Sequence, residues 1–336
     1  MMVKPGILVT RAVFSEVIAH LGEYFQVESN QSDEAWSKAE LIERLQGKVG
    51  AFTTGSERID AEVLAACPTL RICANMAVGY NNFDLDAMTA RGVLGTNAPD
   101  VLTQTTADFG FALLLAAARR VSEGEHFLRA GQWRRWRYDM FAGAEVHGTN
   151  LGILGMGRIG QAIAKRGAMG FDMQVLYHNR SRLTPDIEAQ CGARYVSKDD
   201  LLRTADHLVL VLPYSQQSHH AIGAPELAVM KRSATLVNIA RGGIVDDVAL
   251  ADALRDGRLA AAGLDVFEGE PTVHPALLAL QNVVLTPHIA SATMPTRKAM
   301  AMLAADNLIG FLTDGPVLTP LNPQVLSLPQ HAQRKG

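Results

Sequence analysis

The sequence LGILGMGRIGQAIAKR, residues 151–166, joins a short apolar run to a helix-like run through the glycine pattern GxGxxG. Gly155 permits a tight turn, Gly157 lets the backbone approach a pyrophosphate, and Gly160 allows the helix to pack closely on the strand. The amino end of such a helix offers N–H groups to phosphate oxygens. A second strand-like run follows at residues 173–177. A glycine-rich turn without a ligand is the alternative, but the complete strand–turn–helix–strand context predicts a dinucleotide-binding unit.

Residues 177–182, YHNRSR, occupy the position where a protein that binds NAD normally carries an acidic residue, about 20 residues beyond the glycines. His178, Asn179, Arg180 and Arg182 stand there instead. A carboxylate would repel a 2′-phosphate, whereas a guanidinium binds one through a bidentate fork. The segment therefore predicts a preference for NADP(H), with NAD(H) still accepted. The alternative interpretation is that both arginines are solvated loop charges.

Short apolar runs alternate with helical patterns along the whole chain, which is typical of α/β proteins with parallel sheets. The expected strands lie near residues 7–10, 49–53, 70–75, 93–96, 150–154, 173–177, 207–212, 235–239, 261–266 and 283–285. We expect helices between them, including a long buried helix within residues 99–120 and a final helix at roughly 293–312.

The 336-residue chain is too long for one ordinary core, so two domains are expected. The glycine pattern lies in mid-chain, and too little chain follows residue 289 to form another domain. We expect a dinucleotide-binding domain at residues 101–289, inserted into a discontinuous substrate-binding domain at residues 1–100 and 290–325. Residues 326–336 would form a tail.

Composition restricts the partners of the chain. It is 48% hydrophobic and 19% charged, with a formal net charge of −3, and no basic stripe predicts a nucleic-acid partner. The longest apolar run, residues 109–118, is about half of the ~20 residues that a membrane span needs. Cys67, Cys73 and Cys191 lack metal-ligand spacing, and no secretory leader is recognisable. We therefore expect a cytoplasmic protein with reduced thiols, no membrane partner and no metal.

Three further segments place polar residues just after predicted strands of the same domain. LVNIARGGIVDDVAL carries Arg241, AAGLDVFEGEP carries Asp265, Glu268 and Glu270, and NVVLTPHIASAT carries His288. Ligands of open α/β sheets bind outside the carboxyl ends of the strands. Each residue alone has an ordinary explanation, such as a surface ion pair or a solvated turn. Their combination on one sheet favours an active site.

These segments and the glycine pattern resemble the D-isomer-specific 2-hydroxyacid dehydrogenase family in order and spacing, over residues 5–323. AVGYNNFDLDAMTARGV and TPHIASAT are most similar to bacterial glyoxylate/hydroxypyruvate reductases, also called 2-ketogluconate reductases. The resemblance implies two Rossmann-like or flavodoxin-like parallel-sheet domains. It also implies NADPH-dependent reduction of small 2-keto acids, glyoxylate and hydroxypyruvate, to D-2-hydroxy acids. Two alternatives stay open: 2-keto-D-gluconate as the main substrate, and a nucleotide-sensing corepressor without turnover.

The resemblance also implies roles for individual residues. His288 would be the general acid that protonates the ketone oxygen, and Glu270 would orient its imidazole and favour the protonated form. Arg241 would bind the substrate carboxylate through its planar fork. Backbone N–H groups near Val78 and Gly79 would hold the other side of that carboxylate.

Cofactor contacts and assembly follow from the same resemblance. The implied cofactor contacts are Thr106, Gly155, Gly157, Arg158, Ile159, Gly160, His178, Asn179, Arg180, Leu212, Pro213, Ala240 and Asp265. Asp265 would reach the nicotinamide amide. The family forms homodimers, and Trp133 and Trp136 lie in the segment that helps form the dimer and can cap the partner's active site. Burial of both rings in the dimer interface is the alternative role.

Overall fold

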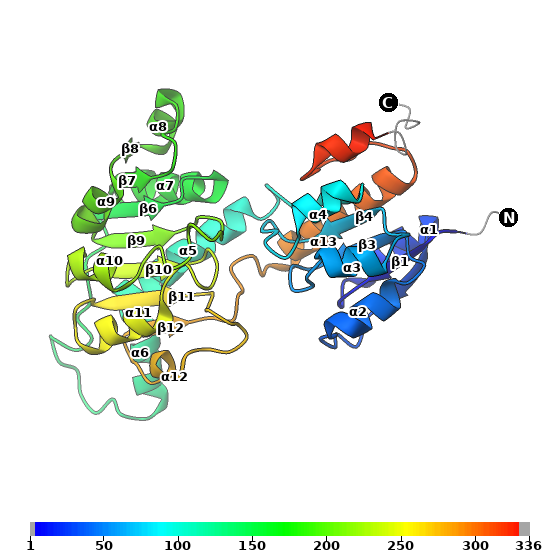
Figure 1. Ribbon diagram of the computed structural model, residues 1–336. Helices are drawn as coiled ribbons and strands as arrows, with labels where there is room; N and C mark the ends of the chain where they lie inside the picture. The colour runs from blue at the N-terminus through cyan, green and yellow to red at the C-terminus, as the bar shows by residue number, and fades with distance from the viewer. Residues whose placement is uncertain (1–3, 329–336) are drawn as a thin grey trace. The chain divides into compact units, whose positions relative to one another are not determined.

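The computed structural model describes residues 4–328 and divides into two compact units, each considered by itself (Figure 1). The first unit contains the chain up to Leu102 together with the chain from Thr293 onward, and the second spans Thr103–Ala292. Residues 329–336 of the expected tail lie outside the described residues. Within residues 4–328, no helix is both long enough and apolar enough to cross a membrane.

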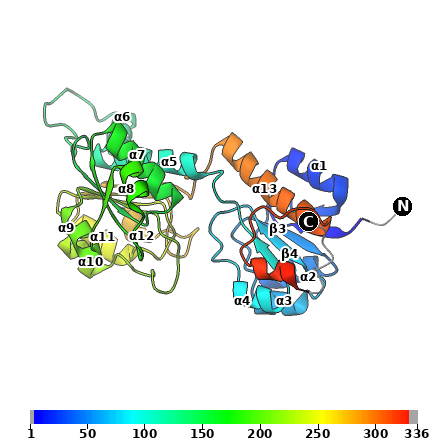
Figure 2. The ribbon, with the colours of Figure 1, turned by 90° about the horizontal axis from the view of Figure 1, so that it is seen from above.

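The first unit is built on a sheet of five parallel strands in the order β2-β1-β3-β4-β5. The strands are β1 (Gly6–Val9), β2 (Gln26–Ser29), β3 (Gly50–Thr53), β4 (Ile72–Asn75) and β5 (Leu94–Thr96). The helices are α1 (Ser15–Tyr24), α2 (Lys38–Leu45), α3 (Ala61–Ala66), α4 (Leu85–Ala90) and α13 (Met294–Leu312), followed by the 3-10 helix η1 (Pro323–Ser327). Helices α1 and α13 cover one face of the sheet and α2, α3 and α4 the other (Figure 2). With both faces covered, the central strands are continuous buried runs.

Two buried asparagines fasten the C-terminal segment to this sheet. Asn307, on α13, accepts hydrogen bonds at Oδ1 from the N–H groups of Leu318 and Thr319, at 2.9 and 3.1 Å. Asn322 accepts a hydrogen bond from the N–H of Gly95 at 2.8 Å and donates one to the carbonyl of Val93 at 3.0 Å. These bonds complete the edge of the sheet at β5 with chain from beyond the second unit.

The second unit contains seven parallel strands in the order β12-β11-β10-β9-β6-β7-β8 (Figure 1). The strands are β6 (Asn150–Leu154), β7 (Gln174–His178), β8 (Ala193–Tyr195), β9 (His207–Leu210), β10 (Thr235–Asn238), β11 (Ala261–Leu264) and β12 (Val283–Leu285). The helices are α5 (Thr103–Ala118), α6 (Val121–Arg129), α7 (Arg158–Gly170), α8 (Pro185–Cys191), α9 (Lys198–Thr204), α10 (Ala224–Val229), α11 (Asp247–Arg255) and α12 (Pro275–Leu278). The strand order reverses between β6 and β9, and ligands of doubly wound sheets bind at such a point.

Two hydrophobic cores fill the space on either side of this second sheet. Leucines of α9, α10, α11 and α12 pack on one face, whereas α5 and α7 pack on the other (Figure 2). Helix α5 is apolar on most sides because it contacts α7 as well as β10 and β11.

The predicted α/β class with two parallel-sheet domains is confirmed. The structure differs from the sequence-based expectations in four elements: β2, β8, α5 and α6. Strands β2 and β8 were not expected, because both are short, partly exposed and poor in apolar residues. The predicted helix over residues 99–120 begins only at Thr103 and ends at Ala118. Arg120 adopts a left-handed backbone conformation, with φ of 54°, which separates α5 from the unexpected helix α6.

Candidate active site

The three glycines of the GxGxxG pattern, just after β6, differ in how much room a side chain would have. Gly155 has φ of 102°, and a Cβ there would lie 2.7 Å from the backbone nitrogen of Leu212. A Cβ at Gly160 would collide with the carbonyl oxygen of Gly155. Gly157, by contrast, faces open space, and no side chain caps the helix that begins after it. Packing therefore requires the first and third glycines, and the second leaves room for a phosphate at the amino end of α7.

The end of β7 holds this turn in place. The N–H of Met156 donates to the side-chain oxygen of Asn179 at 2.6 Å, and the N–H of Gly155 donates to the carbonyl of His178 at 3.1 Å. The His178 ring bonds through Nδ1 to the carbonyl of Val196 at 2.9 Å and stacks on Tyr195. Both residues were expected as cofactor contacts, and the structure shows that they also support the glycine turn.

The surroundings of Arg182 do not match the expectation that both arginines of this turn face a 2′-phosphate. Its guanidinium forms a bidentate ion pair with Glu188 on α8, at 2.9 and 2.7 Å. Tyr177 donates to the same carboxylate at 2.7 Å and accepts from the N–H of Leu183 at 2.9 Å. These contacts, Arg182 first, lower the pKa of Glu188 to about 2, and burial together with Glu188 raises the pKa of Tyr177 to about 12. Arg182 is thus a structural member of this turn.

Arg180 lies on the same turn, and its side chain is exposed. Among residues 4–328, no acidic side chain forms an ion pair with Arg180. The guanidinium of Arg180, unlike that of Arg182, is therefore placed to bind an anion from solution.

His288 and Glu270 meet at the carboxyl ends of β11 and β12. Nδ1 of His288 lies 2.9 Å from Oε1 of Glu270, and both side chains are exposed. His288 adopts a left-handed backbone conformation with φ of 53°, which is uncommon for a residue with a side chain. Such a conformation persists only where the surrounding structure holds it.

Asp265 supplies that support. Its buried carboxylate accepts hydrogen bonds from the N–H groups of Ile289 and Ala290, both at 2.8 Å, and from the Thr286 hydroxyl at 2.7 Å. Its carbonyl also accepts from the N–H of His288 at 2.9 Å. The structure thus makes Asp265 the anchor of the loop that carries His288, while its expected contact with nicotinamide stays a prediction.

Arg241 follows β10 and is half-buried. Its Nη1 donates to the carbonyl of Ala240 at 2.7 Å. Burial lowers the pKa of the Arg241 guanidinium, and the negative charge of Glu270 opposes this shift. Asn238, which the sequence reasoning missed, shapes the turn by accepting from the N–H of Ala240 at 3.0 Å and donating to the Arg241 carbonyl at 3.3 Å. An asparagine at the end of an apolar strand was the sequence feature that could have identified Asn238 as a turn-forming residue.

The turn after β10 packs directly against the turn after β11. A Cβ at Gly242 would overlap the carbonyl oxygen of Phe267, so only glycine fits there. This close approach places Arg241 and Glu270 at the same edge of the sheet, within electrostatic range of each other. The structure thus brings the cationic and the proton-carrying groups of the expected site together.

The remaining expected contacts lie along the same sheet or in the other unit. Leu212 and Pro213 follow β9, and Thr106 of α5 is buried with a hydroxyl that bonds to no protein atom among the described residues. Val78 and Gly79 belong to the first unit, in a turn after β4. Asn97 and Asn75 shape this turn by donating to the carbonyls of Val78 and Gly79 at 2.8 and 3.0 Å.

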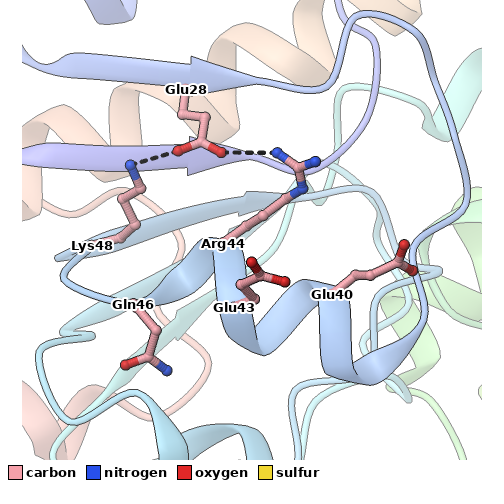
Figure 3. A pocket seen from close by; sticks show the side chains of 6 residues that line it. All are labelled: Glu28, Glu40, Glu43, Arg44, Gln46 and Lys48. Carbon is pink, nitrogen blue, oxygen red and sulfur yellow. Dashed lines mark hydrogen bonds and ion pairs between the residues drawn. The ribbon is translucent and has the colours of Figure 1, made fainter.

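A separate cavity of about 380 Å³ lies in the first unit (Figure 3). Its lining residues are Glu28, Glu40, Glu43, Arg44, Gln46 and Lys48. Glu28 forms ion pairs with Lys48 at 2.7 Å and with Arg44 at 3.2 Å, as Figure 3 shows. Because its cations already pair with a carboxylate of the protein, this cavity is a poorer site for an anionic substrate than the edge of the second sheet.

Comparison with known proteins identifies close relatives. Residues 111–290 match the family model described as D-isomer specific 2-hydroxyacid dehydrogenase, NAD binding domain. The chain is 47% identical over 329 residues to the glyoxylate reductase of Thermococcus onnurineus, covering 97% of this chain and 98% of that protein.

Solved structures give the same result. The NADPH-dependent glyoxylate/hydroxypyruvate reductase of Sinorhizobium meliloti, in complex with NADP and malonate, superimposes with a TM-score of 0.84 at 34% identity, covering 95% of this chain and 97% of that one. A glyoxylate reductase from Paecilomyes thermophila gives a TM-score of 0.86 at 32% identity, with 96% and 100% coverage.

Proposed function

The chain belongs to the D-isomer specific 2-hydroxyacid dehydrogenase family, and on that premise we propose that it reduces glyoxylate and hydroxypyruvate, with NADPH preferred over NADH. It is an NAD(P)-dependent oxidoreductase of 2-keto acids. The observation that carries the proposal is the His288–Glu270 pair, 2.9 Å apart, beside Arg241 at the edge of the dinucleotide-binding sheet.

His288 acts as the general acid. A dinucleotide held at the glycine turn before α7 would supply a hydride to the carbonyl carbon of the substrate. Because Glu270 bonds Nδ1 of the imidazole, proton transfer to the carbonyl oxygen falls to Nε2. The carboxylate also fixes the ring orientation and stabilises the imidazolium before the transfer. After the transfer the imidazole is neutral and the substrate is a 2-hydroxy acid.

Arg241 binds the substrate carboxylate. Its guanidinium is half-buried, so its charge is screened less by water than that of a surface arginine. A planar guanidinium binds a carboxylate through two parallel hydrogen bonds, which orients the neighbouring carbonyl.

Arg180 provides the preference for NADPH. It is exposed on the turn after β7, where no carboxylate replaces the missing acid of NAD-binding proteins. A 2′-phosphate is a dianionic partner for this guanidinium. The Sinorhizobium meliloti relative carries NADP, which supports the same preference here.

The decisive experiment is a comparison of kcat/KM for NADPH and NADH, each with saturating glyoxylate, hydroxypyruvate or 2-keto-D-gluconate. We expect the highest values for NADPH with the two small keto acids. Equal values for both cofactors would overturn the NADPH preference but not the enzyme class. A larger kcat/KM for 2-keto-D-gluconate would replace the proposed substrates by a sugar acid.

We also propose that the enzyme is a cytosolic homodimer. Trp133, Trp136 and Tyr138 follow α6, and they are 51%, 74% and 88% exposed. Aromatic side chains gathered on one segment mark a protein interaction surface. The three cysteines are buried free thiols, as expected in a reducing compartment. Sedimentation equilibrium tests the assembly, and a Trp136→Ser variant is expected to shift it toward monomer.

A further inference from the structure

Two histidines and a glutamate form a cluster at the carboxyl edge of the second sheet. His219 and His220 lie in the segment between β9 and α10, and Glu268 lies in the turn after β11. The two imidazoles stack with centroids 3.9 Å apart. Nε2 of His220 lies 2.9 Å from one oxygen of Glu268, and Nε2 of His219 lies 4.0 Å from the other. One ligand atom from each residue lies within 4.8 Å of the others.

The backbone holds the two segments of this cluster in place. The N–H of His220 donates to the carbonyl of Gly243 at 2.7 Å, and the N–H of Glu268 donates to the Asp247 carboxylate at 3.1 Å. His220 has φ of 48°, a left-handed conformation that these contacts maintain. A Cβ at Gly243 would lie 3.3 Å from Nδ1 of His219, so glycine leaves room for the ring. The cluster is therefore organised before any ligand arrives.

Groups behind the histidines resemble the outer support of known metal sites. The Tyr214 hydroxyl lies 3.2 Å from Nδ1 of His219, and a carboxylate oxygen of Asp246 lies 4.0 Å from Nδ1 of His220. Histidines that bind a metal through one nitrogen usually have the other nitrogen oriented by a hydroxyl, a carbonyl or a carboxylate. Both rings thus present Nε2 to Glu268.

We propose that His219, His220 and Glu268 bind one divalent transition-metal ion of the Zn²⁺ type. Two imidazole nitrogens and one carboxylate oxygen form a donor set that Zn²⁺ accepts at about 2.0–2.2 Å, with a fourth position for water. Mg²⁺ and Ca²⁺ prefer oxygen donors alone, so they do not fit this set. The sequence analysis expected no metal because the three cysteines lack metal-ligand spacing. It did not consider this set of residues, since Glu268 is 48 residues from His220 and the two form no spacing motif. The site does not depend on the proposed substrate or cofactor.

Calorimetric titration of the untagged, chelator-treated full chain with ZnCl2 tests this site. We expect one ion per chain, and a Kd that rises at least about tenfold in His219→Ala and in Glu268→Gln. His147→Ala is the matched control, because His147 is exposed beside Asp172 in the same unit. Its Kd should equal that of the unmodified chain. No saturable binding, or equal Kd values in all four proteins, would overturn the proposal.

Zinc-edge X-ray absorption of the loaded protein gives an independent result. Only nitrogen and oxygen neighbours at about 2.0–2.1 Å are expected. A sulfur neighbour would assign the ion to Cys67, Cys73 or Cys191 and overturn the site. Circular dichroism checks that each variant folds. If His219→Ala does not fold, the nearly isosteric Glu268→Gln variant and the absorption spectrum decide the question.

Discussion

At the scale of single residues, two carboxylates serve His288 in different ways. Glu270 bonds the imidazole, whereas Asp265 holds the backbone of the loop. Removal of the ring by His288→Ala should lower kcat by about 10²–10⁴-fold, because proton transfer loses its positioned donor. The Kd of NADPH, measured by fluorescence titration, should stay nearly unchanged. His126→Ala removes an exposed histidine as the control, and an unaltered kcat in His288→Ala would exclude the acid role.

Asp265 should be important for stability as well as for turnover. An asparagine at this position keeps one acceptor oxygen but turns an amide N–H₂ group toward backbone donors that now bond to the carboxylate. Asp265→Asn should therefore lower the free energy of unfolding by about 1–3 kcal/mol. Urea unfolding measures this change. Asp252→Asn, at an exposed ion pair on α11, should change it by less than about 1 kcal/mol. Similar values for both variants would contradict the anchoring role.

Arg180 and Arg182 should respond differently to substitution despite their proximity in sequence. Loss of a charge-assisted contact costs about 1.5–3 kcal/mol, so Arg180→Ala should raise the KM for NADPH about 10- to 100-fold and that for NADH far less. Steady-state kinetics with both cofactors measures this difference. Arg203→Ala, at an exposed ion pair on α9, is the control. An equal rise in both KM values would mean that Arg180 is a solvated loop charge and does not bind the 2′-phosphate.

At the scale of elements, the stability of the turn from β7 to α8 depends on the ionisation of Glu188. The pKa of Glu188 is lowered to about 2 in the folded chain, from an ordinary value of 4.5. A lowered carboxyl pKa stabilises the fold above the unfolded value, and this stabilisation is lost as the pH falls from about 5 toward 2. The free energy of unfolding should therefore fall more steeply between pH 5 and pH 3 in the unmodified chain than in Glu188→Gln. Urea unfolding at several pH values measures this difference. The same pH dependence of the free energy of unfolding in both proteins would contradict the prediction.

The elements also show what sequence reasoning can and cannot reach. The positions of Arg241, Asp265 and His288 were predictable because each lies within three residues of the end of an apolar strand. The pairing of Arg182 with Glu188 was not predictable, because it depends on how α8 packs against α7 and β8. Strands β2 and β8 were missed for a related reason: their pairing with the more buried strands β1 and β7, and not their own composition, makes them strands.

At the scale of the whole molecule, the first unit is assembled from two distant parts of the chain. Asn322→Ala would leave the N–H of Gly95 and the carbonyl of Val93 without their buried partner, at a cost of about 1–3 kcal/mol. Hydrogen exchange should accelerate in β5 and α13 but not in β6, because these elements belong to different units. Gln324→Ala, which removes an exposed side chain, is the control. Uniform acceleration across both units would show that they unfold together.

Because the second unit is inserted into the sequence of the first, the two units also fold in a fixed order during translation. Nascent chain emerges from its amino end, and domains generally fold as units once their residues are available. The second unit is complete when Ala292 emerges, whereas the first still lacks α13 and Asn322. The part of the chain translated first therefore finishes folding last. During that interval the face of β3 and β4 that α13 later covers is exposed to chaperones.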